Sequence, residues 1–183
     1  GVRVLKLTKD TQPLIYRDDT QPICGLNRVR WTYNSRIRKI RGFGGEIPQP
    51  GERIICCRNN KDEGLFNGGL GTLISLRPGV YGTYILDADM EDLGRPSREL
   101  EVDPYLFRRN FTNGQTDRLR IKGKYLNEYD FSYILTCHKS QGSSWNDVTV
   151  VDDSSAFRDK RWNWLYTAIT RSERALTVLL RDQ

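Results

Sequence analysis

The sequence is poor in the residues that most often build metal and redox sites. Its 183 residues include one histidine and four cysteines, and no two cysteines form a C-x-x-C pair. A tetrahedral zinc site needs four such ligands with characteristic spacing, so zinc binding is not expected. We expect no metal ligands on this chain and four reduced, mostly buried thiols.

The sequence also lacks a hydrophobic run long enough to cross a membrane. No apolar leader is visible, so we expect a cytoplasmic protein in which the sequon at residues 110–112 is not used. The only methionine is Met90, and the sequence begins at Gly1. We expect this beginning to be either a cloning remnant or the cut edge of a longer protein.

Positive charge exceeds negative charge in the chain. Lys and Arg number 29 against 23 Asp and Glu, which gives a formal net charge of +6. The excess favours an anionic partner such as nucleic acid or a nucleotide phosphate. A basic surface that only promotes solubility would give the same total, so charge leaves both interpretations open.

The hydrophobic pattern changes twice along the chain. The first 51 residues, and again the residues from about 129 onwards, combine strand-like runs with helical spacing, which is typical of an α/β domain. Between them, short β-rich pieces separated by Gly, Asp and Pro recur about every ten residues. This spacing predicts a small antiparallel barrel inserted into the α/β domain.

Two helices and several strands are predicted for the α/β part. The first helix begins at Asn27 as N-cap, with Val29, Tyr33, Ile37 and Ile40 on its buried face and its arginines elsewhere. A second helix is expected from about Lys160 to Arg171, with core contacts from Trp164, Leu165, Ala168 and Ile169 and with Tyr166 able to face the core. The expected strands are residues 2–7, 22–26, 129–137, 148–151 and 175–180.

Three segments contain candidate functional residues. Arg28 lies at the start of the first helix, where free N–H groups and the helix dipole favour a phosphate, although a solvated basic face explains it as well. The stretch TCHKSQG from Thr136 to Gly142 follows a strand and gathers polar donors around the single histidine. Arg171 ends the second helix, where a favourable dipole interaction is a sufficient structural reason for an arginine.

Four segments, in this order along the chain, resemble the carboxyl-terminal half of superfamily 1 DNA helicases of the RecD-like and Dda-like group, which has a UvrD-like carboxyl-terminal domain and includes ATP-dependent exodeoxyribonucleases. They match the motifs called IV, V and VI and the segment between them, over most of residues 21 to 181. The segments are LNRVRWTYNSRIR, PQPGERIICCRNNKDEGLFNGGLGTL, TCHKSQGSSWNDVTVV and LYTAITRSERALTVLL.

The resemblance implies a fold and a domain arrangement. Residues 1–63 and 129–183 would form the second RecA-like domain of the helicase, a parallel sheet flanked by helices. Residues 64–128 would form an inserted SH3-like β-barrel. ATP would bind in the cleft between this domain and a missing amino-terminal RecA-like domain, while single-stranded DNA crosses both.

The resemblance also implies roles for individual residues. Arg171 would be the arginine finger that reaches the γ-phosphate, and Arg28 would lie on the same nucleotide cleft. The residues that contact the DNA backbone would be Thr136, His138 and Lys139. Gln141 and Gly142 would link this DNA contact to the nucleotide. Ser144 stands where relatives commonly have a glutamate that binds the ribose, and a serine there is shorter and uncharged.

Half of an ATP-hydrolysing site is missing from the sequence. No G-x-x-x-x-G-K-[ST] segment is present, and the only Asp-Glu pair, Asp62-Glu63, does not follow an apolar strand. The missing amino-terminal domain would therefore hold Mg²⁺ and the β-phosphate, and the chain alone should not hydrolyse ATP.

We therefore expect the carboxyl-terminal fragment of an ATP-dependent helicase that moves 5′ to 3′ on DNA. The alternative is a stand-alone nucleic-acid-binding adaptor derived from such a domain, which the intact Arg171, Lys139 and Gln141 disfavour. A nuclease has little support, because no Asp and Glu cluster stands at strand ends in a metal-binding arrangement.

Overall fold

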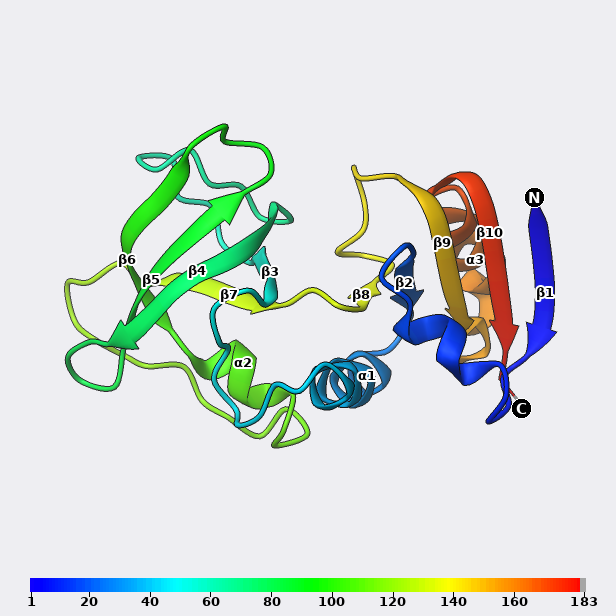
Figure 1. Cartoon of the computed structure of the whole chain (residues 1–183), viewed down its shortest axis with the longest axis horizontal. Coiled ribbons are helices and arrows are strands. Elements are labelled where there is room, and N and C mark those ends of the chain that lie inside the picture. The colour runs from blue at the N-terminus through cyan, green and yellow to red at the C-terminus, as the bar shows by residue number, and fades with distance from the viewer. Residues whose placement is uncertain (182–183) are drawn as a thin grey trace. The chain divides into compact units, whose positions relative to one another are not determined.

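The computed structural model describes residues 1–181, and these form two compact units (Figure 1). The sheet unit comprises Gly1–Tyr33 and Tyr133–Gln183, and the barrel unit comprises Asn34–Ser132. None of the helices described up to residue 181 has the length and apolar character that a membrane crossing needs.

The sheet unit is built on five strands that all run in parallel, in the order β1-β10-β9-β2-β8. Helices lie in most of the connections, as expected for parallel strands, which cannot be joined by tight hairpins. The connection from β2 to β8 also contains the barrel unit, and a loop without a helix joins β8 to β9. The strands are β1 (Val2–Lys6), β2 (Gln21–Cys24), β8 (Leu135–Thr136), β9 (Trp145–Asp152) and β10 (Ser172–Leu180). The helices are η1 (Gln12–Tyr16), η2 (Ser154–Lys160), α3 (Arg161–Ile169) and α1 (Asn27–Ile40), whose residues from Asn34 onwards belong to the barrel unit.

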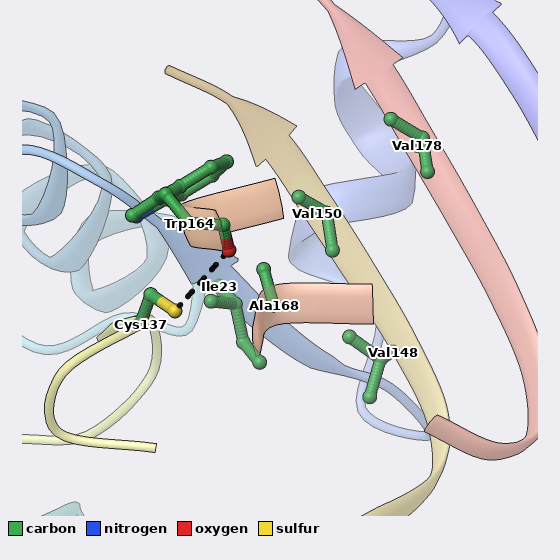
Figure 2. Packing of buried hydrophobic residues seen from close by; sticks show 7 residues of the cluster. All are labelled: Ile23, Cys137, Val148, Val150, Trp164, Ala168 and Val178. Carbon is green, nitrogen blue, oxygen red and sulfur yellow. Dashed lines mark hydrogen bonds between the residues drawn. The ribbon is translucent and has the colours of Figure 1, made fainter. Parts of the chain in front are cut away.

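The core of the sheet unit lies between the sheet and α3 (Figure 2). Trp164 and Ala168 of α3 are buried there, and the Trp164 ring stacks on Phe157 of η2 with centroids 5.4 Å apart. Burying one such aliphatic or aromatic side chain stabilises the fold by about 1.5–3 kcal/mol. The seven residues of the cluster are Ile23, Cys137, Val148, Val150, Trp164, Ala168 and Val178.

The barrel unit contains a closed barrel of five strands in the order β3-β4-β5-β6-β7. Four of its pairings are antiparallel, and β6 pairs with β7 in parallel. The unit also contains the short helix α2 (Tyr105–Arg109). Its strands are β3 (Arg53–Cys56), β4 (Leu70–Pro78), β5 (Tyr84–Met90), β6 (Pro96–Asp103) and β7 (Asn127–Phe131).

The barrel unit is wider than the insertion predicted for residues 64–128. Its first strand, β3, precedes this span, and its last strand, β7, extends beyond it. The run YDFSYILTC, predicted as one strand, is divided between β7 and β8, which belong to different sheets. The sequence does not reveal where one strand ends and the other begins, because both strands are buried and the run is apolar throughout most of its length.

The helix α1 confirms most of its predicted buried face and corrects some details. Val29, Tyr33 and Ile37 are buried, but Ile40 is 58% exposed. Asn27 is already helical, and its side-chain oxygen accepts a hydrogen bond from Arg30 Nε at 3.3 Å instead of capping a backbone N–H. In α3, Tyr166 is 68% exposed, so it does not face the core.

Arg38 of α1 is fully buried, although the arginines of this helix were expected away from its buried face. Its Nε and Nη2 atoms donate to the carboxylate of Glu52 at 2.6 and 2.8 Å, and its Nη1 donates to the Gly45 carbonyl at 2.6 Å. The guanidinium also lies 4.2 Å from the ring centroid of Phe131. Side-chain exposures of 1% and 0% for Arg38 and Glu52 make this a desolvated ion pair.

We expect Arg38→Ala to destabilise the barrel unit by about 3–5 kcal/mol, because it leaves the Glu52 carboxylate buried without its cation. Hydrogen exchange of amides in residues 34–132 should accelerate strongly. Arg77→Ala is the matched control, since Arg77 pairs with Glu99 in solvent, and it should leave exchange unchanged. Equal exchange in the two variants would contradict a stabilising role for the buried pair.

Candidate functional site

The parallel sheet has two edges with different chemistry, and the predicted site residues are divided between them. Because all strands run the same way, their carboxyl ends lie along one edge and their amino ends along the other. Arg28 and the residues that follow β8 belong to the carboxyl edge. Arg171 precedes β10, and Ser143 precedes β9, so both belong to the amino edge.

A polar turn leaves the carboxyl end of β8. The Ser140 amide donates to the Thr136 carbonyl at 3.1 Å, and the Lys139 amide donates to the Thr136 hydroxyl at 3.4 Å. The Ser140 hydroxyl is buried and donates to the Cys137 carbonyl at 2.8 Å. These bonds fix the turn from inside, which leaves His138 exposed and Lys139 half-buried.

The first turn of α1 borders a cavity at the same carboxyl edge. The cavity has a volume of about 290 Å³. Arg28 is exposed there, at a helix start with no acidic residue in its own first turn; the acidic side chains at this position, Asp152 and Asp153, come from the carboxyl end of β9. The lining residues are Leu26, Arg28, Asp152, Asp153, Ser155, Ala156 and Arg181.

Asp153 is a buried carboxylate that the sequence interpretation missed. One of its oxygens, Oδ2, accepts hydrogen bonds from the Gly25 and Leu26 amides at 3.0 and 3.2 Å, and Oδ1 accepts one from Arg181 Nη1 at 2.5 Å. A Cβ atom on Gly25 would lie 2.6 Å from Phe157 Cε2, so only glycine fits this close approach. The sequence feature that could have revealed it is the acidic pair Asp152-Asp153, which directly follows the apolar run of β9.

The carboxylate of Asp153 is thus engaged by amides and a guanidinium. Across residues 1–181, no three His, Cys, Asp or Glu side chains gather in a way that could hold a metal ion. Asp153 therefore acts structurally: it fastens the turn between β2 and α1 to the carboxyl end of β9, and this positions Arg28.

Asp153→Ala should destabilise the sheet unit by about 2–4 kcal/mol, because two amides lose their acceptor and Arg181 loses its carboxylate. Urea unfolding followed by tryptophan fluorescence can measure this, since Trp31, Trp145, Trp162 and Trp164 all lie in the sheet unit. The exposed Asp159 provides the control, and Asp159→Ala should stay within about 0.5 kcal/mol of the unmodified chain. Similar midpoints for both variants would show that Asp153 is dispensable.

At the amino edge, Arg171 follows the carboxyl end of α3 and contacts only neutral oxygens. Its Nε donates to the Thr167 carbonyl at 3.1 Å, its Nη1 to the Ser143 carbonyl at 3.3 Å and its Nη2 to the Thr170 hydroxyl at 3.3 Å. Within residues 1–181 it forms no ion pair. A half-buried guanidinium is thus held in place while its charge remains without a counter-ion.

The loop of residues 137–144 connects the two edges. After the turn at the carboxyl edge, the Ser143 amide donates to the Ser140 carbonyl at 3.2 Å, and the Trp145 amide donates to the Arg171 carbonyl at 2.9 Å. Gly142 has a φ of +87°, a left-handed conformation that favours glycine. A Cβ atom there would meet no other atom, so crowding is not the reason for the glycine. Gln141 and Gly142 are both exposed.

Arg28 and Arg171 lie at opposite edges of the sheet. Strand β9 runs from the amino edge to the carboxyl edge. It has eight residues and spans roughly 23 Å at 3.3 Å per residue. Arg28 lies beyond its carboxyl end, because Gly25 and Leu26 already contact Asp153. Arg171 lies beside its amino end. One phosphate cannot contact both guanidinium groups in this unit.

The cysteines of the sheet unit are poor nucleophiles. Burial raises the pKa of the Cys24 thiol strongly. Burial also raises the pKa of Cys137, while the positive charge of Arg171 acts in the opposite direction. All four cysteines are free, and three are buried, as expected. Because the thiolate is the reactive form, these thiols contribute packing and not covalent chemistry at neutral pH.

Residues 131–179 match the family described as UvrD-like helicase C-terminal domain. The match includes the 137–144 loop, β9, α3 and β10, and therefore both edges of the sheet. The chain thus resembles the carboxyl-terminal domain of superfamily 1 helicases, and its α/β fold with a RecA-like parallel sheet is as predicted.

Particular relatives agree with this class. The RecBCD enzyme subunit RecD of Buchnera aphidicola subsp. Schizaphis graminum (strain Sg) is 27% identical over 128 residues, which are 70% of this chain and 17% of that protein. A Pif1 structure from Bacteroides bound to single-stranded DNA superposes with a TM-score of 0.55 at 15% identity, over 93% of this chain and 45% of the Pif1 chain. The Pif1 helicase from Candida albicans gives a TM-score of 0.53 at 17% identity, over 95% and 50%.

The chain therefore spans about half of the Pif1 chains and about a sixth of the RecD protein that it resembles. At these identities the Pif1 structures establish the fold alone. More than half of the Bacteroides Pif1 chain and half of the Candida albicans Pif1 chain lie outside the matched part.

Proposed function

We propose that this chain is the carboxyl-terminal portion of an ATP-dependent DNA helicase and that the two edges of its sheet serve different ligands. The amino edge contacts ATP, and the carboxyl edge contacts single-stranded DNA. The observation that carries the proposal is the Arg171 guanidinium, which is held at the amino edge by carbonyl and hydroxyl oxygens and has no carboxylate partner in residues 1–181.

Arg171 serves in this proposal as the arginine finger for the γ-phosphate. A positive charge held in place lowers the barrier of phosphoryl transfer by stabilising charge on the transferring group. Its contacts with neutral oxygens orient the guanidinium without neutralising it. A carboxylate partner would have offset the charge that the phosphate needs.

The carboxyl edge serves as the contact with the DNA strand. Thr136 ends β8, His138 and Lys139 follow it, and Arg28 follows the adjacent strand β2, so their backbones lie at one edge. We assign Arg28 to this contact, since the geometry separates it from Arg171. A Pif1 relative of the same fold has been solved bound to single-stranded DNA, and the 5′ to 3′ direction is proposed from the helicase resemblance.

The 137–144 loop couples the two ligands. It begins at the DNA-contacting turn and ends at the Ser143 carbonyl, which accepts a hydrogen bond from Arg171. Gln141 and Gly142 lie between these points and are exposed. A shift of Arg171 towards a phosphate would change the anchor of the loop and thereby the position of His138 and Lys139.

The remaining parts of the ATP site lie outside this chain. The sequence has no P-loop lysine, and the described residues provide no set of three carboxylates or imidazoles for a metal ion. We propose that an amino-terminal RecA-like domain binds Mg²⁺ and the β-phosphate, whose charge Mg²⁺ would offset. The chain described here supplies Arg171 and should not hydrolyse ATP alone.

Arg171→Ala in the full-length protein should lower kcat for ATP hydrolysis by roughly a thousandfold or more, because the transition state loses its cation. Single-stranded DNA binding should remain, since Arg171 lies at the other edge. The matched control is Arg174→Ala three residues later, where an exposed arginine pairs with Asp147, and its turnover should be unchanged. ATP turnover that survives Arg171→Ala would refute the arginine finger.

Lys139→Ala should weaken binding of single-stranded DNA and reduce the slope of log K against log salt by about 1, because one phosphate contact and its released counter-ion are lost. Fluorescence anisotropy with a labelled oligothymidylate at several salt concentrations measures the slope. Lys61→Ala removes the same charge from an exposed turn of the barrel unit and should leave the slope unchanged. Equal slopes in all three proteins would remove Lys139 from the DNA contact.

A further inference from the structure

The barrel unit has a basic surface that takes no part in the proposed mechanism. It surrounds two adjoining cavities of about 290 and 830 Å³, which share Arg118 and Arg120 among their lining residues. Cationic side chains outnumber carboxylates around each cavity. The cations are Arg58, Arg109, Arg118, Arg120, Lys122 and Lys124.

Two buried carboxylates fix the segment that carries most of these cations, residues 118–124. The Leu119 amide donates to Asp103 Oδ2 at 2.8 Å, and Arg118 Nη2 donates to Glu128 Oε1 at 2.5 Å. Asp103 and Glu128 are only 2% and 4% exposed. Both carboxylates are therefore occupied inside the barrel unit, where they hold the segment in place and do not reach the cations that point outwards.

Side chains alternate along this segment as they do in a strand. Exposed basic side chains come from Arg118, Arg120 and Lys122, and half-buried apolar ones come from Leu119 and Ile121. Successive side chains of an extended chain point to opposite faces, so one face of the segment is basic and the other is apolar. Within residues 1–181, Arg120 and Lys122 form no ion pair and keep their charge for a ligand.

The backbone of the segment has an unpaired edge. Residues 115–121, which lead from α2 towards β7, belong to no helix or strand (Figure 1). The Leu119 amide donates inwards to a buried carboxylate, and the Ile121 carbonyl accepts from the following turn at 3.3 Å. Backbone groups of neighbouring residues in an extended chain point to opposite sides. In the described part of the chain the amides and carbonyls of Arg120 and Lys122 make no hydrogen bond, so the outer edge can accept a further strand.

The aromatic rings beside this surface are not available for stacking on bases. The Arg58 guanidinium lies 4.3 Å from the centroid of the Tyr125 ring, and the Tyr125 hydroxyl donates to the Asn59 carbonyl. The Tyr105 ring is only 7% exposed, with Arg109 over it. Grooves for single-stranded nucleic acid combine positive charge with open aromatic faces. This surface has the charge without the open faces, which favours a protein ligand.

We propose that residues 118–122 bind an extended acidic peptide of a partner protein as an added strand. Main-chain hydrogen bonds to the open edge give affinity, and the two faces of the segment give specificity, which is a recurring mode of peptide recognition. Opposed side chains of paired strands share a face. The peptide therefore places carboxylates beside Arg120 and Lys122 and apolar side chains beside Leu119 and Ile121, so its preferred sequence alternates acidic and apolar residues. The inference involves only the barrel unit and does not depend on the ATP and DNA assignments.

Fluorescence anisotropy of the chain with a short labelled peptide in which Asp and Leu alternate tests the proposal. The unmodified chain should bind this peptide, with an affinity that falls as salt is added. The double variant Arg120→Glu/Lys122→Glu should weaken binding roughly tenfold or more, because two attractive contacts become repulsive. A peptide in which Lys and Leu alternate should not bind.

The matched control is the double variant Lys61→Glu/Arg95→Glu. It reverses two exposed charges of the same unit that line neither cavity, and it should leave the affinity unchanged. Equal losses in the two double variants would overturn the proposal, because they indicate attraction to the overall charge of the chain.

A second measurement uses only the unmodified chain, so it does not depend on the folding of any variant. Only one edge of the bound peptide faces the segment. N-methylation of one alternate set of its amides should therefore weaken binding roughly tenfold through lost hydrogen bonds, while methylation of the other set should have little effect. Equal effects of the two methylated peptides would refute strand pairing.

Two further results would overturn the proposal. The first is the absence of binding of the Asp-Leu peptide up to about 1 mM, the range of weak complexes. The second is binding of a labelled oligothymidylate that depends on Arg120 and Lys122 and is tighter than binding of the peptide, which would assign the surface to nucleic acid.

Discussion

The common direction of the five strands is the constraint on which the sheet unit depends. In a parallel sheet every chain segment that leaves a carboxyl end must return to the opposite edge before the next strand begins. Helices make most of these returns, but between β8 and β9 the return is the polar 137–144 loop. This loop therefore contacts both edges.

Two arginines show how differently the same charge is compensated within one chain. Arg38 is desolvated and matched by the Glu52 carboxylate, several carbonyls and an aromatic ring. This buried ion pair stabilises the folded barrel unit, and removal of the Arg38 guanidinium leaves the Glu52 carboxylate buried without a cation. Arg171 is oriented by neutral oxygens and keeps its charge accessible to an anion. Sequence composition counts the two residues alike.

Much of the fold could be predicted from local pattern. Apolar residues at helical spacing located α1 and α3, and short strands at regular intervals indicated the barrel. The prediction was less accurate where two buried strands adjoin in one run, as in β7 and β8. Periodicity reports whether a residue is buried, but it does not report which of two sheets provides the burial.

The sequence by itself determined the types and order of the elements, the class of protein it resembles and the presence of the Arg171 and TCHKSQG segments. Only the tertiary structure decided which residues share an edge. It separated Arg28 from Arg171, buried Arg38 and Asp153, and joined Ser144 to Glu173 through a bulge. The physical reason is that strand order and register set these distances, and both depend on contacts between residues far apart in the chain.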